Sequence, residues 1–90
     1  MYKFLAVCGF GVGSSLVLKM SIEKVAKEMG VECEVENTDL SSAKGLNADA
    51  IFTSQELGEE LKTSTKSPVY PIKRYMDKEE VRNALGEFLS

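Results

Sequence analysis

A cysteine followed at once by a glycine-rich segment is the part of this sequence best suited to chemistry. Cys8 precedes a run of small residues: Gly9, Phe10, Gly11, Val12, Gly13, Ser14 and Ser15. The thiolate is the nucleophilic form of cysteine, and a helix N-terminus favours it. Backbone N–H groups in such a loop and at a helix N-terminus also bind anions such as phosphate. The pattern predicts that Cys8 accepts a phosphoryl group and passes it on, while the residues from Gly9 to Ser15 bind the phosphate.

The flanking residues predict a strand before this loop and a helix after it. Lys3–Val7 is almost continuously apolar, as expected of a central strand buried on both faces. From Leu16 the sequence is amphipathic, with Ser14 or Ser15 suited to cap the helix and Gly30 suited to end it. The expected inner face of the helix comprises Leu18, Ile22, Val25 and Met29.

Three more strands are predicted from the remaining apolar segments. Val31–Glu36 alternates strictly between apolar and charged residues, which is typical of a half-exposed strand at a sheet edge. After a polar connection with one short helix ending at Gly45, Ala48–Phe52 forms a buried strand. Pro68–Ile72 is the fourth strand, and Pro71 places it at the other edge because proline cannot donate to a sheet ladder.

Two capping boxes predict where the last two helices begin. Thr53 with Glu56 would start a short helix whose apolar residues are Leu57 and Leu61. Asp77 with Glu80 would start the final helix. Its expected inner face comprises Val81, Ala84, Leu85 and Phe88.

Most other charged residues are expected to have structural roles. Asp39 and Asp77 could supply a proton, but their positions favour turns and caps. Lys19 is expected to be solvated, although a contact to phosphate is the alternative. Lys73–Tyr75 is a short basic segment that is expected at the surface, where it could contact an acidic partner.

The regular alternation of strands and helices predicts an α/β fold. It is a doubly wound four-stranded parallel sheet with strand order 2-1-3-4, in a single domain over residues 1–90. In such folds ligands bind beyond the carboxyl ends of the strands at which the winding reverses, here strands 1 and 3. Cys8 follows strand 1 and is therefore expected there.

Composition narrows the possible functions. The chain has 90 residues and a net charge of −3, and it has no basic stripe, which argues against nucleic acid as a partner. No apolar run approaches the length of a membrane span, and no signal peptide is evident, so we expect a cytoplasmic protein without membrane insertion. The chain contains no histidine, which argues against Cys-His nucleophile pairs and most zinc sites. We expect no metal and no cofactor, and we expect Cys33 to be a core residue.

A dinucleotide-binding loop is the main alternative from the residues alone. Gly9 and Gly11 match the first two glycines of that fingerprint, and Glu36 could be its ribose-binding acid. Ser14 stands where the third glycine or alanine belongs. Four strands are also too few for the two halves of such a fold.

The segment from strand to helix resembles the IIB components of the bacterial phosphoenolpyruvate-dependent sugar phosphotransferase system. The likeness is greatest to the ascorbate-type branch, with galactitol- and lactose-type proteins more distant. The resemblance implies that Cys8 accepts a phosphoryl group from a phosphohistidine on a IIA protein. Cys8 would deliver it to a sugar held by the membrane IIC permease, and Gly9 to Ser15 would form the phosphate loop.

The same loop also resembles low-molecular-weight tyrosine phosphatases. Their pattern is a cysteine, five residues, an arginine and a serine or threonine, and here Ser14 replaces the arginine while Ser15 matches the hydroxyl. That arginine clamps the phosphate oxygens, so without it hydrolysis should be slow. A phosphatase-like hydrolase is therefore the second hypothesis, after a carrier.

Overall fold

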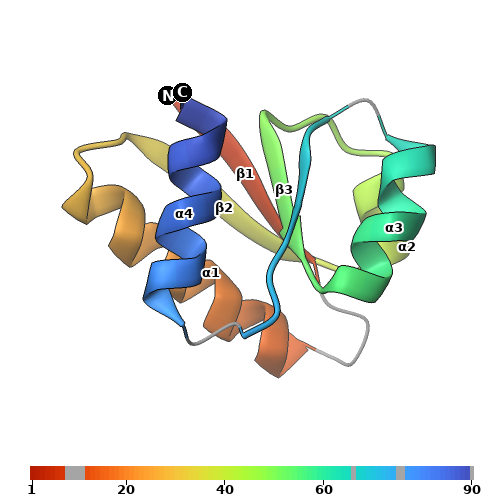
Figure 1. Cartoon of the computed structure of the whole chain (residues 1–90). Helices are drawn as coiled ribbons and strands as arrows, with labels where there is room; N and C mark the ends of the chain where they lie inside the picture. Colours follow the sequence, from red (N-terminus) through yellow and green to blue (C-terminus); the bar gives the residue numbers. More distant parts are fainter. Residues whose placement is uncertain (8–11, 66, 75–76, 90) are drawn as a thin grey trace.

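The computed structural model describes residues 1–7, 12–65, 67–74 and 77–89, with the backbone alone for residues 12–15. Strands and helices alternate along this part of the chain, as the sequence predicts (Figure 1). In order they are β1 (Tyr2–Val7), α1 (Val12–Glu28), β2 (Cys33–Thr38), α2 (Leu40–Lys44), β3 (Ala50–Thr53), α3 (Gln55–Ser64), β4 (Val69–Pro71) and α4 (Lys78–Leu89).

The strands form a parallel sheet in the order β2-β1-β3-β4. α1 and α4 cover one face of the sheet, and α2 and α3 cover the other (Figure 1). The chain winds outward from β1 to β2 and then returns past β1 to β3, which puts the first two crossover helices, α1 and α2, on opposite faces. The predicted doubly wound fold and its strand order are confirmed.

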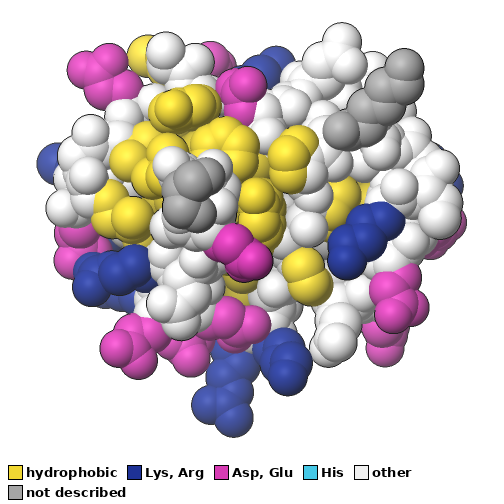
Figure 2. Space-filling view, turned by 45° about the horizontal axis from the view of Figure 1, so that its top comes forward, with side chains coloured by type: hydrophobic (Ala, Val, Ile, Leu, Met, Phe, Trp, Pro, Cys, Tyr) yellow, Lys and Arg dark blue, Asp and Glu magenta, His cyan; other side chains and the backbone are white. Residues whose placement is uncertain are grey.

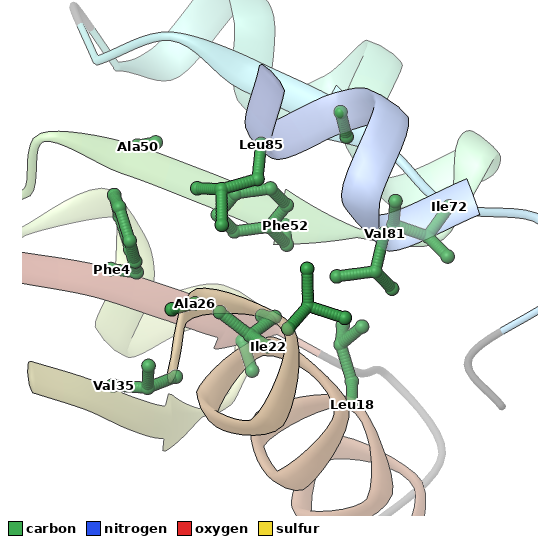
Figure 3. Close-up of a cluster of buried hydrophobic side chains, with 13 residues drawn as sticks. Phe4, Leu18, Ile22, Ala26, Val35, Ala50, Phe52, Ile72, Val81 and Leu85 are labelled. Carbon is green, nitrogen blue, oxygen red and sulfur yellow. The ribbon is translucent and has the colours of Figure 1, made fainter. Parts of the chain in front are cut away.

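β1 is buried on both faces. Phe4, Leu5, Ala6 and Val7 are each 0% exposed. Because side chains alternate along a strand, Phe4 and Ala6 join the core under α1 and α4, whereas Leu5 and Val7 join the core under α2 and α3. In the first of these cores the rings of Phe4 and Phe52 meet edge to face, with centroids 5.5 Å apart (Figure 3). Helical side chains complete it: Leu18, Ile22, Val25, Ala26, Val81, Ala84 and Leu85.

The face of α1 that packs on the core ends about one turn earlier than predicted. The helix stops at Glu28, so Met29 lies beyond it and is 37% exposed, and Ala26 is the last core residue instead. Gly30 has a positive φ of 73°, and the Val31 N–H donates to the Ala26 carbonyl at 2.8 Å. This is the Schellman arrangement that glycine favours, so the predicted stop at Gly30 is confirmed.

β2 is shifted along the chain relative to its prediction. The alternating pattern placed it at Val31–Glu36, but the strand runs over Cys33–Thr38. Val31 is used in the turn that ends α1, and the Glu32 carbonyl accepts the N–H of Tyr2 at 3.1 Å just before the regular ladder. Its predicted place at a sheet edge is confirmed.

The other strands differ from their predictions by one or two residues. β3 begins at Ala50 and extends to Thr53, and β4 is confined to Val69–Pro71. β4 lies at the edge of the sheet, as Pro71 predicted. Thr53 completes β3 and does not cap α3; the cap is Ser54, whose Oγ accepts the Leu57 N–H at 3.3 Å. The strand retains Thr53 because it pairs with the last residue of β1.

The predicted capping box at the start of α4 is half right. Asp77 Oδ1 accepts the N–H groups of Glu79 and Glu80 at 3.0 and 3.3 Å, so Asp77 caps the helix. The Asp77 N–H donates to the Arg74 carbonyl instead of to Glu80. The Glu80 carboxylate accepts the N–H groups of Lys73 and Arg74. The predicted inner face is confirmed, with Val81, Ala84 and Leu85 buried and Phe88 partly buried against them.

Candidate active site

The site predicted at Cys8 lies where the chain passes from β1 to α1. β1 ends at Val7 and α1 begins at Val12. The residues between them, 8–11, include Cys8, Gly9, Phe10 and Gly11 and lie outside the described residues. The structure therefore fixes the two elements that flank the predicted nucleophile.

The first turn of α1 contains the other predicted phosphate-binding residues: Val12, Gly13, Ser14 and Ser15. The N–H groups at the start of an α-helix have no intrahelical partner, and in α1 they include those of Val12, Gly13 and Ser14. No acidic residue occupies this turn, so the positive end of the helix dipole is not offset there. Ser14 and Ser15 lie inside the helix, so their predicted role as N-caps is wrong. Apolar spacing predicted the helix only from Leu16 onward and therefore missed its first turn.

All four strands end together at one edge of the sheet, which we call the carboxyl edge. Val7 pairs with Thr38 of β2 and Thr53 of β3, and Thr53 pairs with Pro71 of β4. α1 leaves this edge on one face and α3 leaves it on the other (Figure 1). The carboxyl ends of β1 and β3 are thus the point at which the winding reverses, where folds of this type bind ligands.

Thr53 is a buried polar residue at this edge that sequence reasoning misassigned. Its side chain is 0% exposed, and its Oγ1 donates to the Val7 carbonyl oxygen at 3.0 Å. The capping-box pattern of Thr53 and Glu56 predicted a helix cap instead of this hydrogen bond. Counting the strand alternation onward from Ile51 could have found it, because Thr53 then faces the same core as Ile51.

A groove opens at the carboxyl ends of β3 and β4. Its volume is about 530 Å³, and its described lining residues are Ser54, Gln55, Glu56, Glu59, Ile72 and Lys73. Lys73 and Arg74 are exposed, as predicted for this short basic segment, whereas Tyr75 lies outside the described residues. The groove brings acidic side chains of α3 and a basic side chain after β4 to the same edge as the predicted nucleophile.

Exposed apolar side chains extend along α1 from its N-terminal part. Leu16, Val17 and Met20 are 46%, 38% and 61% exposed. Separate apolar surface lies at the opposite edge of the sheet, where both chain termini are found (Figures 1 and 2). There Met1 and Tyr2 are exposed, and Tyr2 packs edge to face against Phe88 at 5.3 Å.

The second thiol is remote from the carboxyl edge. Cys33 is the first residue of β2 and pairs with Tyr2, at the amino ends of the strands. It is half-buried against the core, and burial, with a smaller contribution from Glu23, raises the pKa of its thiol. Its packing against the core confirms the expected core role of Cys33. The raised pKa also disfavours the nucleophilic thiolate.

Two carboxylates near the site prove to be structural. Asp39 caps α2 by accepting the Ser42 N–H at 2.7 Å, and this hydrogen bond lowers the pKa of Asp39. This hydrogen bond confirms the predicted cap role of Asp39. Glu36 pairs with Leu5 in the middle of β2 and lies 3.8 Å from the Lys3 ammonium, so it is not at the strand tip that a ribose-binding acid requires.

Comparison with known proteins agrees with this architecture. The solved lactose-specific IIB component domain of the phosphoenolpyruvate:carbohydrate phosphotransferase system from Streptococcus pneumoniae has the same fold. The two structures superpose with a TM-score of 0.69 and are 18% identical in sequence. The superposition covers 98% of this chain and 94% of the lactose-specific domain. The fold is therefore that of a IIB domain.

Sequence comparison identifies the family. The family model described as PTS system, Lactose/Cellobiose specific IIB subunit matches residues 3–87. The ascorbate-specific PTS system EIIB component of Mycoplasma pneumoniae is 33% identical over 87 residues, which make up 94% of this chain and 92% of that protein. The chain belongs to the IIB family of the sugar phosphotransferase system, which implies phosphotransferase activity and, in general, IIA and IIC partners. Within the described part of the chain, no helix has both the length and the apolar character needed to cross a bilayer.

Proposed function

We propose that this protein is a cytoplasmic phosphoryl carrier that works through phosphorylation of Cys8. The observation that supports this most directly is the position of Cys8 in the chain, immediately after β1 and four residues before α1 begins. Residues 1–90 would act as one IIB domain. Gly9, Phe10 and Gly11, together with the first turn of α1, would bind the phosphoryl oxygens through backbone N–H groups.

The reaction has two transfers. The Cys8 thiolate attacks the phosphorus of a IIA phosphohistidine, so that an S–P bond forms while the N–P bond breaks and the imidazole takes up a proton. A hydroxyl oxygen of the sugar held by IIC then attacks the same phosphorus. The S–P bond breaks, the hydroxyl loses its proton, and the thiolate is regenerated. The chain has no histidine of its own, which is consistent with a donor imidazole supplied by a partner.

The sugar is proposed to be ascorbate-like. The description of the family names lactose and cellobiose as its sugars. The Mycoplasma pneumoniae relative, in contrast, is named for ascorbate, and its match with this chain covers almost the full length of both proteins. Uptake of labelled ascorbate, lactose and cellobiose by cells that carry the matching IIA and IIC proteins would test this choice.

Mass spectrometry tests the carrier mechanism. The protein is mixed with phosphoenolpyruvate, the general carrier proteins and a matching IIA, and we expect the mass to rise by one phosphoryl group. Cys8→Ser should abolish stable labelling, whereas the matched control Cys33→Ser should retain it. Labelling that persists in Cys8→Ser would overturn the mechanism.

A hydrolase is the competing function, and Ser14 distinguishes the two. Ser14 stands where the phosphatase pattern has its arginine, and removing one donor aimed at developing charge costs roughly 10²–10³ in rate. We expect negligible turnover of aryl phosphates by the native protein and faster loss of phosphate from Cys8 in Ser14→Arg. Met20→Arg adds the same charge at an exposed position of α1 and is the control. Rapid turnover of aryl phosphates by the native protein would favour the hydrolase.

A further inference from the structure

We propose that Thr53 is a positioning residue for Cys8. Its Oγ1 donates to the carbonyl oxygen of Val7 at 3.0 Å. The carbonyl carbon of Val7 is bonded to the nitrogen of Cys8, and the peptide unit that they share is planar. A hydrogen bond that holds this carbonyl therefore orients the peptide plane through which the chain leaves β1. The inference rests on the proposed function of Cys8 as the phosphoryl acceptor.

The surroundings of Thr53 hold its side chain in place. It is completely buried, and the Thr53 carbonyl accepts the N–H of Ile72 at 2.7 Å, which ties the end of β3 to the chain after β4. Its methyl group lies against α3 at Gly58, where an added Cβ would be 3.5 Å from Thr53 Cγ2. With the methyl group packed there, the hydroxyl is directed to the Val7 carbonyl.

The position does not need a polar side chain for packing. Alternation along β3 places Thr53 on the same side as Ile51, in a core that also contains Leu5, Val7 and Leu61. Valine has nearly the same shape and at least the same preference for strands, and a buried hydroxyl is unfavourable unless it is hydrogen-bonded. Among the described residues, no other polar side chain is fully buried. The hydroxyl therefore has a specific task, which is its bond to Val7.

Phosphoryl transfer is sensitive to such positioning. The sulfur, the phosphorus and the leaving nitrogen must be nearly in line, and catalysis depends mainly on alignment and charge stabilisation. A misplacement of about 1 Å can reduce a rate by about 10²-fold. Releasing the Val7 carbonyl should therefore slow transfer without removing the nucleophile.

The test compares three variants in a Cys33→Ser background, where Cys8 is the only thiol. Thr53→Val removes the hydroxyl and keeps the shape, and Thr53→Ser keeps the hydroxyl. Ile51→Val is the matched control, a buried change on the same face of β3 that leaves the hydrogen bond to Val7 in place. Two rates are measured for each: single-turnover transfer from phosphorylated IIA, and alkylation of Cys8 as a function of pH without any partner.

We expect Thr53→Val to slow transfer at least about 10-fold and to shift the pH profile of alkylation, with Thr53→Ser and Ile51→Val close to the parent protein. Parent-like behaviour of Thr53→Val in both assays would overturn the proposal, as would an equal loss in Ile51→Val. If Thr53→Val does not fold, Thr53→Ser and Thr53→Ala are compared, because they differ in the hydroxyl alone. Absence of phosphorylation in the parent protein would instead refute the proposed function, and the alkylation assay would still decide the role of Thr53.

Discussion

The carboxylate of Glu80, in the first turn of α4, accepts the backbone N–H of Lys73 at 2.6 Å. Its second oxygen accepts the N–H of Arg74 at 3.0 Å. One side chain thus holds two consecutive backbone donors of the segment that follows β4. Because Lys73 lines the groove at the carboxyl edge, Glu80 fixes a wall of that groove from outside it.

Removing this carboxylate should destabilise the protein. Glu80→Ala leaves two N–H groups without their charged acceptor, and we expect the free energy of unfolding to fall by about 1–2 kcal/mol. Glu80→Gln keeps one side-chain oxygen and should lose less. Glu79→Ala changes an exposed neighbour in the same turn and should stay within about 0.5 kcal/mol of the native value. Urea unfolding measures all three, and equal losses for Glu79→Ala and Glu80→Ala would contradict this role.

Glycine substitutions should have opposite effects in different parts of the fold. Gly58 lies in α3 and Gly86 in α4, and an added Cβ would make only ordinary contacts at Gly58 and none at Gly86. Alanine at either position should raise the free energy of unfolding by about 0.5–1 kcal/mol, because glycine weakens a helix interior. Gly30→Ala should lower it by about 1 kcal/mol, because Gly30 has φ +73°. Thermal or urea unfolding would show the difference in sign, and stabilisation by Gly30→Ala would contradict the assigned turn.

The cap of α2 should make stability depend on pH. The Ser42 N–H lowers the pKa of Asp39 in the folded chain, so the folded state binds fewer protons there than the unfolded state. This contribution is complete above the unfolded pKa and is lost as the pH falls through the folded pKa. The stability advantage of the native protein over Asp39→Asn should therefore be constant near neutral pH and shrink in acid. Urea unfolding across that range is the measurement, and an advantage that grows in acid would show that the sign is wrong.

The two thiols should become reactive at different pH values. Burial raises the pKa of Cys33, so its thiolate forms only in more alkaline solution. The N-terminus of α1 is expected to favour the thiolate of Cys8. Alkylation at a series of pH values, followed by peptide mass spectrometry, should label Cys8 first, with Cys8→Ser and Cys33→Ser identifying the two peptides. Labelling of Cys33 at the lower pH would contradict this order.

Strand order and, except at Met29, the inner faces of the helices could be predicted because they depend on residue types at regular spacing. The apolar run before Cys8 identified the central strand, and Pro71 identified an edge. Element boundaries were less predictable because neighbouring elements compete for the same residues. Val31 fits the alternation of β2, but its N–H is used to end α1.

The setting of the candidate site could be predicted from the sequence, because the strand before Cys8 and the helix after it are both present. That Cys8 is the nucleophile stays a prediction from loop composition, and this composition could not show that α1 begins at Val12. The roles of Thr53 and Glu80 depend on partners distant in the sequence, Val7 and Lys73. Short-range capping patterns matched both residues and therefore gave them the wrong partners.

The composition of the two outer strands also affects how this sheet meets other molecules. Pro71 leaves β4 without one N–H group, and β4 is only three residues long. At the other edge, β2 exposes Glu34 and Glu36. Short strands, proline and repeated charge all discourage the addition of a further strand. A sheet built this way resists the edge-to-edge pairing that leads to aggregation.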